Sequence, residues 1–424
     1  MRTYDQLLEE IFQRFPSVQS VPFSQAYKPG LEGMRFFDEA LGQPSKRFRS
    51  VHVAGTNGKG SVANMLASAF DACGYKTGLY TSPHILDFRE RMRIGGEMVP
   101  REWVYDFLCR WKPYFEEHSL SFFEITTGMA FKWFADSKVD VAVVEVGLGG
   151  RLDSTNIITP ELAIVTTIGL DHCALLGNTL AEIAAEKAGI FKRGVPALVG
   201  EWNAETRPVF EAKAEGLCDV YGPSRTICPS PAEPLECERI LSQMDLQAEP
   251  QRDNLRTVLA AIELLKPKFP ALGDTERVVD GIVHTAARMH FHGRWELLRE
   301  SPPVIADIGH NAQALQSNFR KLEAMGHPII IYGIMADKDL DAIIPLMPRQ
   351  ASWIFTTPNT ARALPAEAIA ERCQMPDVMV IPSVKDAVQH ALALAGESRP
   401  VYIGGSTFVV AEALPSFSAR YLNA

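Results

Sequence analysis

A glycine-rich loop, GTNGKGS at positions 55–61, limits the fold of this chain more than any other segment. An apolar run at 50–54 precedes it, and the residues after it are apolar at intervals of three and four, which predicts a helix over Ser61–Cys73. Gly74 is typical of a residue that ends a helix. A strand, a tight turn and a helix in this order predict one unit of an α/β fold.

The loop has the residue types that bind phosphate. Small residues let successive backbone N–H groups approach anionic oxygens, the helix N-terminus adds its dipole, and a lysine neutralises the outer phosphates. The residues that fit these requirements are Gly55, Gly58, Lys59 and Gly60. The usual pattern G-x-x-x-x-G-K-[ST] is not met, because an extra glycine separates the lysine from the serine. A glycine-rich turn without a ligand is the alternative.

Further apolar runs predict a parallel sheet around this unit. They lie at 77–80, 139–146 and 162–168, and each is continuous rather than alternating, as expected for parallel strands that are covered on both faces. The stretch 202–251 is rich in Pro, Glu and Cys and has no clear period, so we predict short strands and loops there. A helical pattern returns around Asn254–Leu265.

A second alternation of strands and helices follows HFHGRWE at 290–296. Strands are expected near 304–307, 329–334, 353–356, 378–381 and 401–403. A chain of 424 residues is long enough for two domains. We therefore predict an α/β protein with a P-loop nucleotide-binding domain over 1–292, built on a mostly parallel sheet, and a smaller Rossmann-like α/β domain over 293–424.

Composition excludes several classes of function. A net charge of −9 gives no general attraction for nucleic acid or anionic membranes. The seven cysteines are scattered without metal-ligand spacing, which predicts reduced thiols in a cytoplasmic protein. The N-terminal segment is amphipathic and acidic, unlike a signal peptide. No apolar segment approaches the roughly 20 residues that span a bilayer. We expect a cytoplasmic monomer that binds neither nucleic acid nor membrane.

Two side chains near strand ends are candidates for the magnesium site that ATP would need. Glu145 is the only acid in the apolar run 141–146 and stands near the carboxyl end, where open α/β sheets bind ligands. A structural carboxylate paired with Arg151 is the alternative. His172 follows the next strand and should emerge at the same edge, although a lone histidine is more often structural. Lys187 lies in the stretch AEIAAEKAGIFK, whose pattern is that of an ordinary solvated helix, so these arguments do not select it.

An ordered series of motifs makes the sequence more specific. The series is GTNGKGS, TSPHILDFRERMRIGGE (81–97), FFEITTGMAF (122–131), VEVGLGGRLDSTNII (144–158), GLDH (169–172), EKAGIFK (186–192), QRDNLRTVLAA (251–261), HGRWE (292–296), DIGHNAQA (307–314), GIMADKD (333–339) and GGS (404–406). Together these closely resemble the folylpolyglutamate synthase and dihydrofolate synthase family, within the larger group of ATP-dependent ligases that includes the Mur peptidoglycan ligases.

The resemblance implies a site for ATP and two magnesium ions. The residues that would contact the nucleotide are Gly55, Thr56, Asn57, Gly58, Lys59, Gly60, Ser61, Asn254, Arg294 and Asp307. The magnesium ligands would be Ser82, Glu145 and His172, and Lys187 matches a family lysine that is carbamylated and binds or orients the second ion. ATP would then lie between the two domains.

The resemblance also implies where folate or dihydropteroate and L-glutamate bind. The pterin contacts would be Pro29, Gly30, Phe122, Phe123, Glu124, Ile125, Leu152, Asp153 and Ser154, although adjacent phenylalanines are more often core residues. His310 and Ser406 are the candidates for glutamate. The chain departs from the family pattern at DIGHNAQA, where D-x-A-H-N-P is usual, after GGS, where some relatives carry a histidine, and at YKPGLEGM (27–34).

The implied reaction is amide ligation. ATP converts a carboxylate of folate, of dihydropteroate or of both into an acyl phosphate, and the amine of L-glutamate displaces phosphate. Lys59 and the magnesium ions would neutralise the transferring phosphoryl group, Lys187 would support the metal, and His310 or Asp307 would position the amine or accept its proton. The rival hypotheses are a silent nucleotide-binding module, a Mur-type ligase for a UDP-sugar peptide and a P-loop kinase.

Overall fold

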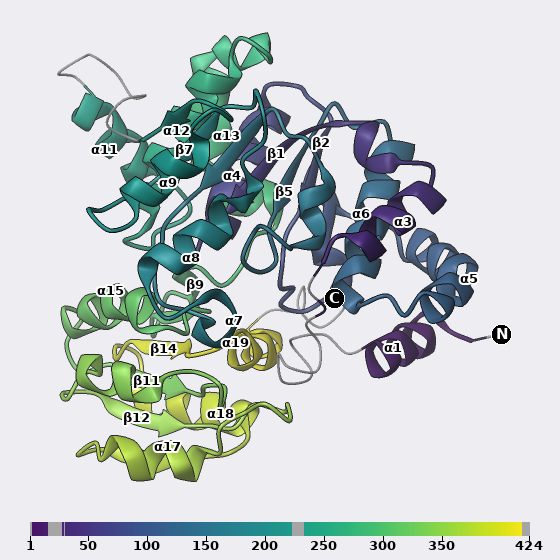
Figure 1. Cartoon of the computed structure of the whole chain (residues 1–424). Coiled ribbons are helices and arrows are strands. Elements are labelled where there is room, and N and C mark those ends of the chain that lie inside the picture. Colours follow the sequence, from purple (N-terminus) through teal and green to yellow (C-terminus); the bar gives the residue numbers. More distant parts are fainter. Residues whose placement is uncertain (1, 16–27, 29, 223–232, 418–424) are drawn as a thin grey trace.

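Two mostly parallel sheets form the framework of the protein. The computed structural model describes residues 2–15, 28, 30–222 and 233–417, and Figure 1 shows the chain with one sheet in each of two lobes. The large sheet has the order β4-β3-β2-β5-β1-β6-β7-β8 and the small sheet the order β13-β12-β11-β14-β10-β9. The predicted fold class is confirmed, because the antiparallel pairs within these sheets are limited to β2 with β3, β3 with β4 and β9 with β10.

The large sheet contains β1 (Arg49–Ala54), β2 (Thr77–Tyr80), β3 (Met92–Ile94), β4 (Glu97–Met98), β5 (Val141–Glu145), β6 (Leu162–Val165), β7 (Ala197–Val199) and β8 (Val220–Tyr221). The small sheet contains β9 (Glu296–Arg299), β10 (Val304–Asp307), β11 (Ile329–Tyr332), β12 (Ser352–Phe355), β13 (Val378–Val380) and β14 (Val401–Gly404). The strands predicted from continuous apolar runs are all present.

Helices cover both faces of each sheet. The α-helices described before residue 293 are α1 (Tyr4–Arg14), α3 (Glu32–Ala40), α4 (Lys59–Ala72), α5 (Arg101–Glu117), α6 (Phe122–Asp136), α7 (Cys173–Leu176), α8 (Leu180–Lys187), α9 (Arg207–Ala214), α11 (Glu233–Gln243), α12 (Gln251–Leu265), α13 (Thr275–Val283) and α14 (Thr285–Met289). The later ones are α15 (Ala312–Glu323), α16 (Leu340–Ile343), α17 (Ala366–Cys373), α18 (Val384–Ala395) and α19 (Thr407–Ala413). None of the helices in the described ranges is long and apolar enough to cross a membrane.

Strand β5 shows why the runs are continuous rather than alternating. Val141 and Val143 pack into the core under α4, α12 and α13, whereas Ala142 and Val144 pack into the opposite core with α5 and α6. Because both faces are buried, every position of the strand is apolar until Glu145 at its carboxyl end. The change from apolar residues to a carboxylate therefore marks the point where the strand ends, at the carboxyl-terminal edge of the sheet.

The prediction for residues 202–251 is wrong. The described part of this stretch holds helices α9 and α11 and a single short strand, β8. In α9, Phe210 and Ala214 are buried four residues apart, and in α11, Cys237 and Ile240 are buried three residues apart. Each helix thus has one narrow apolar face. The resulting sequence pattern is too short to be recognised as helical among the prolines and glutamates of this stretch.

Candidate active site

The glycine-rich loop joins β1 to α4 with backbone angles that require glycine. Gly58 has φ +85°, and a Cβ on it would lie 2.3 Å from Asn254 Oδ1. Gly55 has φ +150°, and a Cβ on it would lie 1.9 Å from Thr166 Oγ1. The same threonine hydroxyl donates to Asn57 O at 2.6 Å. The residues after β6 therefore hold the loop in shape. A side chain at Gly55 would break the contact with Thr166, and one at Gly58 would displace Asn254.

Two lysines share the carbonyl groups of the loop. Lys59 Nζ donates to Gly55 O at 3.0 Å and to Thr56 O at 3.1 Å, and Lys187 Nζ donates to Gly55 O at 2.8 Å. Burial, together with the nearby Lys59 ammonium, lowers the pKa of Lys187 to about 7. The description of Lys187 as part of a solvated helix is wrong, because only 4% of this residue is exposed.

Glu145 and Ser82 meet beside the loop. Ser82 N donates to Glu145 Oε2 at 3.1 Å. Burial raises the pKa of Glu145, while Lys59, the Ser82 amide and Arg294 oppose that rise. The alternative that Glu145 serves as a structural partner of Arg151 is wrong, because the Arg151 guanidinium pairs with Glu186 at 2.9 Å.

His172 lies on the same wall as the two lysines. Burial lowers the pKa of His172 to about 3, so the imidazole is neutral at pH 7 and can offer a lone pair to a cation. Across the described residues, no three His, Cys, Asp or Glu side chains gather into a metal site. The hydroxyl of Ser82, the carboxylate of Glu145 and this imidazole are a donor set that suits a divalent ion whose remaining ligands are phosphate oxygens and water.

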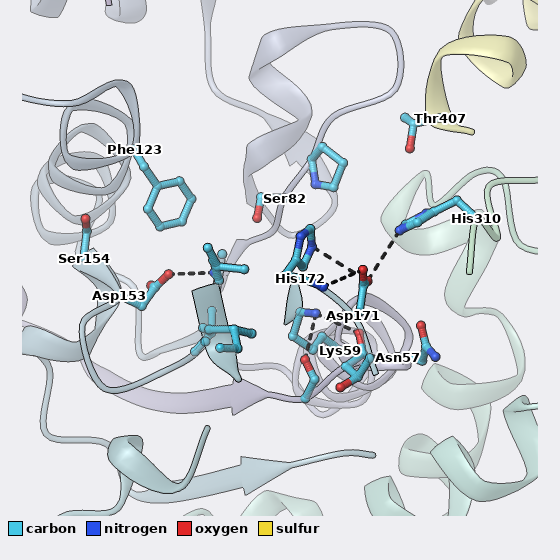
Figure 2. Close-up of a pocket in the computed structure, with 18 of the residues that line it drawn as sticks. Asn57, Lys59, Ser82, Phe123, Asp153, Ser154, Asp171, His172, His310 and Thr407 are labelled. Atoms are coloured by element: carbon cyan, nitrogen blue, oxygen red, sulfur yellow. Dashed lines mark hydrogen bonds and ion pairs between the residues drawn. The ribbon is translucent and has the colours of Figure 1, made fainter. Parts of the chain in front are cut away.

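A cavity of about 260 Å³ connects most of the predicted site residues. Figure 2 shows Lys59, Ser82, His172 and His310 around it, with Phe123, Asp153 and Ser154 on the opposite side. The predicted residues that line it are Gly55, Thr56, Asn57, Lys59, Ser82, Phe122, Phe123, Leu152, Asp153, Ser154, His172, Lys187, His310 and Ser406. The loop, the aromatic wall and the second domain thus face one space.

A smaller cavity of about 30 Å³ lies on the other side of Ser82. Gly60, Glu145 and Arg294 line it. A Cβ on Gly60 would lie 3.8 Å from Glu145 Oε2 and 3.6 Å from Arg294 Nη2. The extra glycine of the loop therefore leaves room between α4, the acid at the end of β5 and an arginine just before the second sheet.

Several predicted residues lie away from both cavities. Glu124 caps α6, where its Oε2 accepts from Ser121 N at 2.7 Å, and Ile125 belongs to the core. Asp307 accepts hydrogen bonds from Trp295 N at 2.8 Å, Gly309 N at 2.7 Å and Asn318 Nδ2 at 2.8 Å, and burial raises its pKa. Asp307 therefore does not face the space where an amine would arrive.

The remaining predicted residues have other positions. Ser61 is buried in α4 and its Oγ accepts from Gln251 Nε2 at 3.3 Å, and Asn254 stands against Gly58. Gly30 has φ +127° and does not line either cavity. Pro29 lies outside the described residues.

Sequence reasoning missed a charged part of the main cavity. Asp171, Lys338, Arg362, Arg91 and Lys28 line it and were not selected. Lys338 Nζ donates to Asp171 Oδ1 at 2.9 Å across 167 positions of sequence. The motifs GLDH and GIMADKD contain this pair, but only the docking of the two domains brings their side chains together.

Comparisons with known proteins agree with this arrangement. The Mur ligase middle domain matches residues 53–214, and the Mur ligase glutamate ligase domain matches residues 293–407. The fold and the site therefore define a Mur-type, ATP-dependent ligase. The dihydrofolate synthase/folylpolyglutamate synthase of Bacillus subtilis is 31% identical over 410 residues, which cover 91% of this chain and 94% of that protein. The chain belongs to the folylpolyglutamate synthase/dihydrofolate synthase family.

Other relatives extend the comparison. A Haloferax volcanii protein named "Probable bifunctional folylpolyglutamate synthase/dihydropteroate synthase" is 33% identical over 91% of this chain, which spans 48% of that protein's length. The structure of Escherichia coli FolC in complex with DHPP and ADP matches with a TM-score of 0.82 and 29% identity over 99% of this chain and 100% of that one. The Yersinia pestis bifunctional enzyme, complexed with AMPPNP and Mn ion, matches with a TM-score of 0.82 and 26% identity over 98% of this chain and 99% of that one.

Proposed function

We propose that this chain ligates L-glutamate to a carboxylate of folate, dihydropteroate or both, at the expense of ATP. The observation that carries the proposal is the single cavity that joins a phosphate loop, the metal-type donors Ser82 and His172, an aromatic wall and the second domain, with Glu145 next to Ser82. A silent nucleotide-binding module would not need these donors and this wall to meet. The family relatives named above, including the Bacillus subtilis enzyme, support the choice of substrates.

The nucleotide phosphates would bind at the loop. Thr56, Asn57, Gly58 and Lys59 would hold them, and Asn254, which stands against Gly58, and Arg294, which stands near Gly60, would also contact the nucleotide. In the present structure the Lys59 ammonium is held by two loop carbonyls, which phosphate oxygens would replace as partners. A lysine in this position stabilises negative charge on a transferring phosphoryl group without any proton transfer.

Ser82, Glu145 and His172 would hold a divalent ion, which supplies charge neutralisation when it is bound. Lys187 would be carbamylated: its neutral amine attacks carbon dioxide, a C–N bond forms, and one proton leaves. A pKa of about 7 leaves a large fraction of this amine neutral at physiological pH, as that reaction requires. The product is a carboxylate in place of a buried cation, suited to a second metal ion.

The organic substrate would lie along the aromatic wall. Phe123 is partly exposed to the cavity, whereas Phe122 is 3% exposed and packs into the core, so Phe123 is the better candidate for stacking on a planar ring. Asp153 and Ser154 would offer polar contacts at that end. His310 and Ser406, from the second domain, would face the incoming glutamate at the other end.

The reaction then follows in two balanced steps. A carboxylate oxygen of the organic substrate attacks the γ-phosphorus, the bond to the β-phosphate oxygen breaks, and ADP leaves. The glutamate ammonium group loses one proton, its amine nitrogen attacks the carbonyl carbon, and the bond to the phosphate oxygen breaks, so that phosphate leaves as hydrogen phosphate with the second proton. Because the cavity lies between two domains, their closure around the substrates would exclude water, which would otherwise hydrolyse the acyl phosphate.

Measuring ADP release tests the proposal. With ATP and magnesium present, release should require both the pteroate substrate and L-glutamate, and an amide product one glutamyl residue heavier should accumulate. Lys59→Ala should abolish this turnover. Lys266→Ala is the control and should leave turnover unchanged, because Lys266 lies at the end of α12 and pairs with Glu263 of that helix. ADP release without glutamate, or a phosphorylated organic product, would favour a different class of enzyme.

A further inference from the structure

Asp171 is one of two carboxylates among the described residues that line the main cavity, the other being Asp153. Figure 2 shows them at opposite sides, with Asp153 near Phe123 and Asp171 between His172 and His310. Asp153 accepts hydrogen bonds from Leu148 N and Thr155 N, within its own loop. Asp171 therefore is the carboxylate that remains at the end of the cavity where the second domain contributes its side chains.

The partners of Asp171 come from both domains. From the second domain, Lys338 Nζ donates to its Oδ1 at 2.9 Å and His310 Nε2 lies 3.8 Å from its Oδ2. From the first domain, His172 Nε2 lies 3.7 Å from the same Oδ2. The side chains of Asp171 and Lys338 are 13% and 10% exposed. The cavity thus contains a nearly buried pair of a carboxylate and a primary ammonium group, and the carboxylate belongs to the domain that carries the phosphate loop.

An amino acid that binds where the two domains line the cavity carries an ammonium group of its own. Desolvating that cation is costly unless a carboxylate receives it. Asp171 already holds a primary ammonium in the geometry that a substrate ammonium needs, and the donor it holds, Lys338, is on a flexible side chain that can leave. Asp307, the acid expected here from sequence, is occupied by three other donors.

We propose that Asp171 binds the α-ammonium group of the incoming amino acid, which replaces Lys338 Nζ as its partner. The inference rests on the proposed function and adds to it an amine-anchoring residue for the second substrate. It predicts that an amino acid is selected over a dicarboxylic acid of the same length, since only the former supplies the cation. Before the amino acid binds, Lys338 keeps the carboxylate paired.

The test compares wild type with Asp171→Asn and Asp171→Glu in three assays. The first gives KM for L-glutamate, ATP and folate. The second replaces glutamate with hydroxylamine, a small amine that is neutral at pH 7 and traps the acyl phosphate as a hydroxamate. The third measures inhibition by glutarate, which has both carboxylates of glutamate and no amine. Titration of each variant with ADP verifies that the nucleotide site is folded.

Asp171→Asn should raise KM for glutamate at least about tenfold, while KM for ATP and folate, the hydroxamate rate and glutarate inhibition stay within about twofold. Asp171→Glu should recover part of the glutamate affinity. The proposal is overturned if the glutamate KM is unchanged, if hydroxamate formation falls as much as ligation, or if the magnesium requirement changes instead. Absence of hydroxamate from the wild type would refute the proposed function itself, so the two failures are distinguishable.

Discussion

Replacing Lys187 with methionine should stabilise the empty protein and abolish ligation. Its ammonium group is buried at the end of α8, next to the Lys59 cation, and donates to Gly55 O. Methionine has a similar length and no charge, so it keeps the packing and removes the cost of desolvating a cation. A residue that weakens the fold in this way is retained for function rather than for stability.

The magnitude follows from the shift of the pKa. Burial lowers the pKa of Lys187 from 10.5 to about 7, and one pKa unit corresponds to about 1.4 kcal/mol. Below pH 7 both the folded and the unfolded chain hold the proton, and the full cost is present. Between pH 7 and 10.5 only the unfolded chain holds it, so the wild type gains stability as pH rises. After about 1 kcal/mol is subtracted for the lost hydrogen bond, the variant should be more stable by about 3 kcal/mol at pH 7 and by about 1 kcal/mol at pH 9.

Urea denaturation at pH 7, 8 and 9, in buffer free of bicarbonate and nucleotide, measures this difference. Lys213→Met is a matched control, since Lys213 is an exposed lysine on α9 and its replacement should change stability little at any pH. A variant at Lys187 that is no more stable than wild type at pH 7 would refute the reasoning. A gain that does not change with pH would refute it as well, because the slope is the signature of the depressed pKa.

Two further substitutions test the loop and its surroundings. Gly58→Ala should lower the free energy of unfolding by about 1–2 kcal/mol, since a φ of +85° is strained for alanine and the new Cβ would displace Asn254. It should also weaken ADP binding, which calorimetry measures. Unchanged affinity for ADP would show that the loop tolerates a side chain. Arg151→Ala should change stability by less than about 1 kcal/mol and leave the magnesium titration of the ligase reaction unchanged, because its partner is the surface residue Glu186. A shifted titration would mean that Arg151 does support Glu145.

The sheets and the phosphate loop could be predicted because their signals are local. A parallel strand buried on both faces is a continuous apolar run, and the loop needs glycine at fixed positions for reasons of backbone geometry. Glu145 stood out by the same logic, as a charge at the end of an apolar strand. The helices within 202–251 did not stand out, because among their described side chains each buries two residues of its apolar face.

The remaining site residues depend on packing that no local pattern records. Lys187 lies in a sequence typical of a solvated helix, yet the end of α8 packs closely against Gly150, where a Cβ would lie 2.8 Å from Lys187 O. The Lys187 side chain is buried and its Nζ donates to Gly55 O in the phosphate loop. The resemblance to known ligases selected Lys187 where physical reasoning from the sequence did not. Asp171 and Lys338 meet only because two domains dock, so their pairing could not be anticipated from either motif.

The central claim is that the loop and the donors around it converge on one nucleotide and its divalent ions. Anomalous scattering from crystals grown with AMPPNP and Mn²⁺ tests it most directly. The account predicts a manganese peak about 2 Å from a Glu145 oxygen, with His172 or Ser82 as a further ligand and phosphate oxygens between the ion and Lys59. A well-bound nucleotide whose manganese lies away from all three donors would contradict the account.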